Sequence, residues 1–129
     1  MRLADGIALH PAGAGDASLR SEMLIAGRPT GAVVPGRVLE AAVRCAPGWL
    51  LFVTDDTPYE EMLAIHLVDD QGRLLDTARI GGPYTTGSFS GLRLDPPATA
   101  HFRFIDDAHW SVRALDRARP ALPWWPDAR

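Results

Sequence analysis

The feature that most constrains the fold is the run WLLFV at residues 49–53, which is apolar at every position. Successive side chains of a β-strand point to opposite faces, so an uninterrupted apolar strand must be covered on both sides. The preceding Ala46-Pro47-Gly48 is typical of a turn. We therefore expect residues 49–53 to form the central strand of the core.

Further β-prone segments alternate with turn signals along the rest of the chain. The aspartate pairs Asp55-Asp56, Asp69-Asp70 and Asp106-Asp107 each follow an apolar run and mark loops between strands. Residues 37–45 fit a helix face or an alternating strand, and the short turn that follows favours a strand. The sequence predicts a strand at 21–26, a loop at 27–36, hairpins pairing 60–68 with 73–80 and 99–105 with 109–115, and a short strand at 89–94.

A chain of 129 residues fits a single domain with a proper core. The short strands, about six to eight in number, and the lack of long helical periodicity predict an all-β fold. Its expected form is a single-domain antiparallel β-sandwich or flattened barrel. We expect an irregular N-terminal segment at 1–18, a strand-rich body at 19–117, and a Pro- and Trp-rich tail at 118–129.

Charge and cysteine content narrow the class of protein. The net charge of -3 argues against a nucleic-acid surface, which needs clustered basic residues. All basic residues are arginines, a bias that suggests a bacterial, GC-rich source. The lone Cys45 precludes an intramolecular disulfide and forms no zinc motif. Without a signal-peptide pattern or a membrane-spanning run, a cytoplasmic location is expected, with no cofactor and no membrane partner.

Acidic residues supply the first candidate sites. The loop after the central strand carries Asp55, Asp56, Tyr59 and Glu60, and paired carboxylates can act as general acid and base or bind a partner. The turn aspartates could bind Ca²⁺, but they lack the alternating pattern of a calcium loop. A charged, solvated loop is the simpler interpretation, so we assign neither a catalytic residue nor a metal site.

Hydroxyl and aromatic residues supply two more candidates. Tyr84 and Thr85 lie in the Gly- and Pro-rich connection 81–97, where a small-ligand pocket could form. Trp124 and Trp125 lie between prolines in the tail and offer a large amphipathic surface. They could contact a partner, and we favour docking onto the domain itself.

Histidines and arginines are expected to be solvated or packed. His66 shares a half-apolar face and is expected to be a packing residue. The predicted last hairpin pairs Ile105 with His109, which separates His101 and His109 too widely for one metal ion. Its outer face would be a solvated basic strip and not an RNA surface, because the aromatic residues alternate onto the inner face. That strip consists of His101, Arg103, Ser111 and Arg113.

The sequence therefore predicts recognition more than catalysis. Acidic loops, exposed sheet edges and the Trp-rich tail offer binding surfaces, and no catalytic motif accompanies them. We expect a protein that binds another protein, as a bacterial inhibitor or immunity-type protein does. A small-ligand-binding protein or an enzyme with its pocket beside residues 81–97 is the alternative. Homo-oligomers are compatible with the sequence.

Overall fold

The computed structural model describes residues 1–12, 20–46, 48–55, 62–81, 88–96, 98–105, 108–114 and 126–128. This part of the chain is all-β, as predicted, and contains no helix. Its strands are β1 (Arg2–Leu3), β2 (Ile7–Pro11), β3 (Arg20–Ile25), β4 (Arg28–Pro35), β5 (Val38–Cys45), β6 (Gly48–Thr54), β7 (Met62–Asp69), β8 (Leu74–Gly81), β9 (Ser90–Asp95), β10 (Thr99–Arg103), β11 (His109–Arg113) and β12 (Pro126–Ala128).

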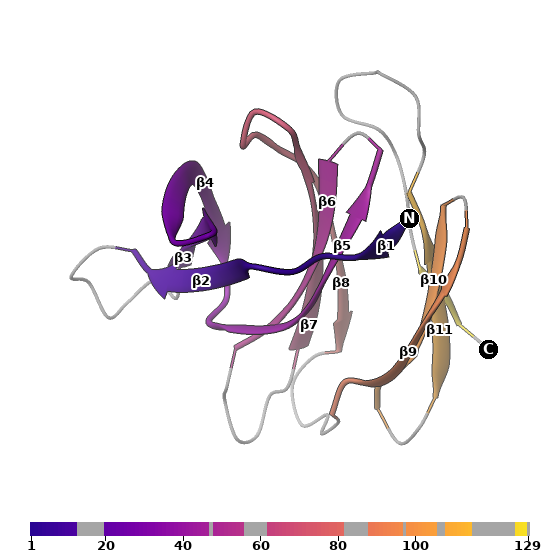
Figure 1. The fold of residues 1–129 in the computed structure, drawn as a ribbon. Coiled ribbons are helices and arrows are strands. Elements are labelled where there is room, and N and C mark those ends of the chain that lie inside the picture. Colours follow the sequence, from indigo (N-terminus) through magenta and orange to yellow (C-terminus); the bar gives the residue numbers. More distant parts are fainter. Residues whose placement is uncertain are drawn as a thin grey trace.

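The strands form three antiparallel sheets, which we call the N-terminal, central and C-terminal sheets. The central sheet has the order β1-β5-β6-β7-β8, the C-terminal sheet β12-β11-β10-β9, and the N-terminal sheet β2-β3-β4. In Figure 1 the central sheet lies between the other two. The prediction of a single sandwich or flattened barrel was therefore wrong. The physical reason is that β6 and β7 carry buried, mostly apolar side chains on both faces, so each face of the central sheet needs a cover.

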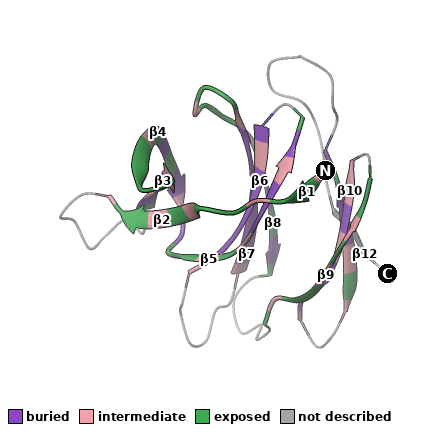
Figure 2. Ribbon diagram, viewed as in Figure 1, coloured by how far each residue is buried: buried purple, intermediate pink, exposed green. Residues whose placement is uncertain are grey.

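Strand β6 contributes to two separate cores, which confirms the prediction that both of its faces are covered. Leu50 and Phe52 belong to the cluster that includes Phe102 of the C-terminal sheet. Leu51 and Val53 belong to a second cluster with Met23 and other residues of the N-terminal sheet. All of these β6 side chains are buried, and Figure 2 shows buried residues along the strands of the central sheet.

The predicted hairpin between β7 and β8 is confirmed. Gly72 has a φ of 81°, which a residue with a side chain rarely adopts. The carboxylate of Asp69 accepts hydrogen bonds from the N–H groups of Gln71 and Arg73, each at 2.9 Å. Desolvation raises the pKa of this carboxyl, but these bonds and the Arg73 charge together outweigh it, so the pKa lies below its ordinary value. Asp69 therefore acts as a turn cap, as expected of an aspartate here.

The N-terminal segment contains strands where an irregular path was expected. β2 pairs with β3, with Leu9 opposite Met23. Ile7 and Leu9 pack against the second core, whereas Ala8 and His10 are exposed. This alternation is the strand signal that the neighbouring glycines and Pro11 obscured.

Strand β4 corrects the prediction of a loop at residues 27–36. Its prolines, Pro29 and Pro35, suggested a loop because proline cannot donate to a ladder. β4 is an edge strand of its sheet, and at an edge proline is tolerated. Ala32 and Val34 alternate into the core and hold the strand in place.

His66 lies fully buried between the central and N-terminal sheets and is a packing residue, as expected. Its Nε2 lies 3.1 Å from the carbonyl oxygen of Pro35, and its Nδ1 lies 2.9 Å from Thr77 Oγ1. Since a carbonyl only accepts, Nε2 carries the proton and Nδ1 accepts from the hydroxyl. Burial lowers the pKa of His66 to about 4, so the ring is neutral at physiological pH.

Candidate binding face on the C-terminal sheet

Alternation along β9, β10 and β11 separates an apolar inner side from a basic outer side. On the inner side, Leu92 and Phe102 pack into the core shared with the central sheet. The outer side chains come from positions between these apolar residues. We call their basic members the basic face, which consists of Arg93, His101, Arg103, His109 and Arg113.

The hairpin between β10 and β11 has a different register from the predicted one. His101 lies opposite Ser111 and Arg103 opposite His109, so the pairing is shifted relative to the expectation of Ile105 opposite His109. Ile105 has a φ of 62° and belongs to the turn, where its carbonyl accepts from the N–H of Ala108 at 2.9 Å. The shift places His109 beside Arg103 on the basic face.

A hollow of about 290 Å³ is set into the basic face. Arg93, His101, Arg103 and His109 line it, together with Phe102 and Trp110. The indole N–H of Trp110 already has a hydrogen-bond partner, because Nε1 donates to the carbonyl oxygen of Phe104 at 2.9 Å. Two arginines and two histidines therefore give the hollow a basic lining.

Arg103 is held over this hollow by its neighbours. Its Nε donates to Nε2 of His109 at 3.1 Å, which requires that nitrogen of His109 to be unprotonated. Across the strand pair, Gly91 has a φ of 64°, and a Cβ there would lie 3.7 Å from the Arg103 side chain. The positive φ favours glycine here, whereas a Cβ would make only an ordinary van der Waals contact with Arg103.

Within the described ranges, the positive charges of the basic face have few carboxylate partners. Among the described residues, Arg93, Arg103 and Arg113 take part in no ion pair. His101 Nε2 lies 3.7 Å from a carboxylate oxygen of Asp95, a pair that is ionic only when the histidine is protonated. A guanidinium without a carboxylate partner can bind carboxylate or phosphate oxygens in bidentate fashion. The face therefore suits an anionic ligand or surface.

A second hollow, of about 380 Å³, lies near the N-terminus and carries weaker chemistry. Arg44 lines it but is already paired with Asp70 at 2.6 Å and lies 4.2 Å from the centre of the Trp49 ring. Cys45 also lines it, and burial raises the pKa of its thiol to about 11. The thiol is thus protonated at physiological pH and is no activated nucleophile.

Most of the predicted site residues lie outside the described part of the chain. Asp55 follows β6 and is half-buried. The other predicted site residues are outside the described ranges, namely Asp56, Tyr59, Glu60, Tyr84, Thr85, Trp124 and Trp125. The end of the tail is described as β12, which pairs with β11 and places Pro126 opposite Val112.

Sequence reasoning identified the outer strip of β10 and β11 but missed Arg93. The signal for Arg93 was the alternation Leu92-Arg93-Leu94, which places an arginine between two inward-facing leucines. Ser111, expected on the outer face, pairs with His101 and with Asp127 and is buried.

No group of His, Cys, Asp and Glu within the described ranges could hold a metal ion. Nor does that part of the chain contain a helix able to cross a membrane. In comparisons with known proteins, no family model, curated protein or solved structure matches the chain.

Proposed function

We propose that this chain is a protein-binding domain that recognises a negatively charged surface of a partner through the basic face. The observation that carries the proposal is the segregation of charge. The chain has a net charge of -3, yet the outer side of β9, β10 and β11 gathers arginines and histidines around one hollow. An excess of charge of one sign on a sheet face favours a partner of the opposite sign.

A protein partner explains this face better than a nucleic acid. Binding of single-stranded nucleic acid combines basic residues with exposed aromatic rings on which bases stack. Here Phe102 is buried, and Trp110 packs against the core and donates its N–H to the backbone. An inhibitor or immunity-type role in the cytoplasm would be one instance of such protein binding.

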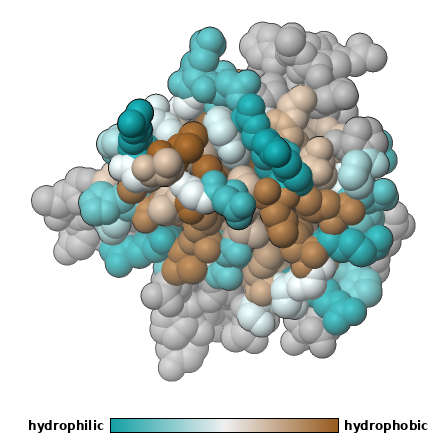
Figure 3. Space-filling model, viewed as in Figure 1, coloured by the Kyte–Doolittle hydropathy of each residue, from teal (hydrophilic) through white to brown (hydrophobic). Residues whose placement is uncertain are grey.

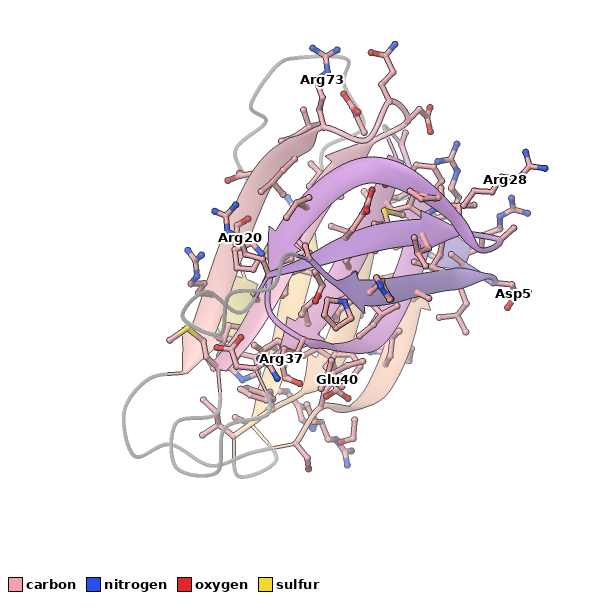
Figure 4. All side chains as sticks on the ribbon, turned by 90° about the vertical axis from the view of Figure 1, so that its left-hand side faces the viewer. Asp5, Arg20, Arg28, Arg37, Glu40 and Arg73 are labelled. Atoms are coloured by element: carbon pink, nitrogen blue, oxygen red, sulfur yellow. The ribbon has the colours of Figure 1, made fainter. Side chains whose placement is uncertain are left out.

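Affinity capture with charge-reversed variants tests the proposal. Arg93→Glu combined with Arg103→Glu should abolish retention of a specific partner from lysate of the source cell and leave the melting temperature nearly unchanged, because Arg93 and Arg103 are exposed. The matched control is Arg20→Glu combined with Arg28→Glu, which makes the same charge change at exposed positions of the N-terminal sheet. Figure 4 shows both control arginines on that side of the molecule.

The control variant should retain the partner. Equal loss of the partner in both variants would indicate an effect of net charge, and retention by the basic-face variant would reject the proposal.

The hollow in the basic face also favours a second candidate, a small-ligand-binding protein. Gly91 and Arg93 belong to the connection 81–97, so a small anion bound here would lie beside it. Titration with inorganic phosphate, followed by NMR, separates the two functions. Tight and saturable binding that perturbs Arg93 and Arg103 would favour the small ligand.

A further inference from the structure

Within the described part of the chain, strand β9 has a free edge next to the basic face. Among the described strands it pairs with β10 alone, and it is the last strand of its sheet. An edge strand exposes N–H and C=O groups with which another extended chain can pair. The register irregularity opposite His101 to Arg103, together with the φ of Gly91, kinks the start of β9. The regular edge is therefore the stretch at residues 92–95.

The inner side of this edge is apolar and incompletely covered. Leu92 and Leu94 are only partly buried, and so is Met1, which packs against the same core. Leu3 of β1 is 62% exposed. β1 is the edge of the central sheet, and Figures 1 and 4 place β1 and β9 on the same side of the molecule. Figure 3 shows hydrophobic surface between them.

The outer side of the same edge carries Arg93 and Asp95, and with the neighbouring Arg103 its net charge is positive. Arg93 lies between Leu92 and Leu94, pairs across the sheet with His101, and lines the hollow with Arg103. A strand added beside β9 would therefore meet apolar surface with one set of alternate side chains. With the other set it would meet the guanidinium groups of Arg93 and Arg103, which outnumber the single carboxylate of Asp95. The two sides of β9 together specify a pattern in the added strand.

We infer that the partner contributes an extended segment that pairs with β9 and in which acidic and apolar residues alternate. This inference rests on the proposed function. The apolar side chains of the segment cover Leu92 and Leu94, and its carboxylates bind Arg93 and Arg103. A second copy of this chain is the less suitable occupant, because its β9 would bring only one carboxylate, Asp95, together with its own Arg93.

The probe is a short labelled peptide with blocked ends in which glutamate and valine alternate. Fluorescence anisotropy should show that it binds roughly tenfold or more tightly than a peptide alternating lysine and valine. A glutamate–valine peptide of the same composition but with all glutamates at one end should bind equally weakly. Methylation of every second backbone amide blocks strand pairing along one edge of the peptide. Of the two peptides methylated at odd or at even positions, one should lose binding, because its blocked edge is the one that faces β9. The Arg93→Glu variant should bind the alternating glutamate–valine peptide roughly tenfold or more weakly than the wild type does. The matched variant Arg28→Glu should bind this peptide as the wild type does.

Each contrary result has a distinct meaning. Equal binding of the alternating and blockwise peptides would overturn pairing with β9 and leave charge recognition by the basic face intact. Pairing with β9 would also be overturned if the alternating peptide failed to bind at about 1 mM while the basic-face variant still lost its partner. Self-association through β9 in sedimentation experiments would overturn the assignment of the occupant. Retention of the partner by the basic-face variant would instead reject the proposed function itself.

Discussion

At the scale of single residues, His66 joins strands of two sheets. Its ring contacts Thr77 of β8 and the backbone of Pro35 in β4, so it links the central and N-terminal sheets. A neutral ring satisfies both contacts. Burial opposes protonation, so the folded protein keeps His66 neutral at an acidic pH at which the same residue of the unfolded chain is protonated.

Stability should consequently fall as the pH drops from 6.5 to about 4. Over this interval the unfolded chain binds a proton at position 66 and the folded protein does not, so the free energy of unfolding decreases and then levels off below pH 4. The difference of about 2.5 pH units corresponds to about 3 kcal/mol. Urea denaturation across this range measures it.

His66→Gln provides the control, because its amide can still donate to Pro35 but does not titrate. The stability advantage of the wild type over this variant should shrink towards pH 4. Parallel stability curves for the two proteins would contradict the assignment of a buried neutral ring.

At the scale of elements, β6 depends on both of its neighbouring layers. Leu50 faces the C-terminal sheet and Leu51 the N-terminal sheet, and both are fully buried. Leu50→Ala and Leu51→Ala should each lower the free energy of unfolding by roughly 2 to 5 kcal/mol. Leu74→Ala, at a side chain that is 42% exposed, should cost far less. If chemical denaturation showed a large loss for Leu50→Ala only, the N-terminal sheet would not cover the central one.

The elements also show what the sequence could and could not reveal. The sequence predicted β5 to β11. β6 is uniformly apolar and β7 alternates, whereas residues 37–45 fitted a helix equally well and only the turn that follows them favoured a strand. β4 was not predicted, because a strand tolerates prolines when it lies at a sheet edge. The position of a strand at an edge is a property of the whole fold and cannot be read from its own residues. The register of the β10–β11 hairpin was predicted wrongly because Ile105 adopts a left-handed conformation, which is rare for isoleucine.

The candidate site was predictable to the same partial extent. Alternation placed His101 and Arg103 on an outer face correctly, but a single hairpin gave no reason to add Arg93. Only the pairing of β9 with β10 brings Arg93 beside His101 and closes the hollow. The pairing of these two consecutive strands therefore converts a basic strip into a basic face. It was missed because residues 81–97 were predicted to be one long connection.

At the scale of the whole molecule, the three layers give the two outer faces different characters. On the side of the N-terminal sheet, Figure 4 shows carboxylates and arginines together, among them Asp5, Glu40, Arg20 and Arg28. The C-terminal sheet instead presents the basic face. Because the central sheet separates these faces, a partner attracted by charge should bind on one side of the molecule only.

Hydrogen–deuterium exchange of the protein, alone and bound to its captured partner, tests this account most directly. Backbone amides covered by a partner exchange more slowly, and the effect can be mapped along the chain. We expect slower exchange in β9, β10 and β11 and unchanged exchange in the outer strands β2 and β4. Slower exchange confined to the N-terminal sheet, with β9 to β11 unaffected, would contradict the claim that the basic face binds the partner.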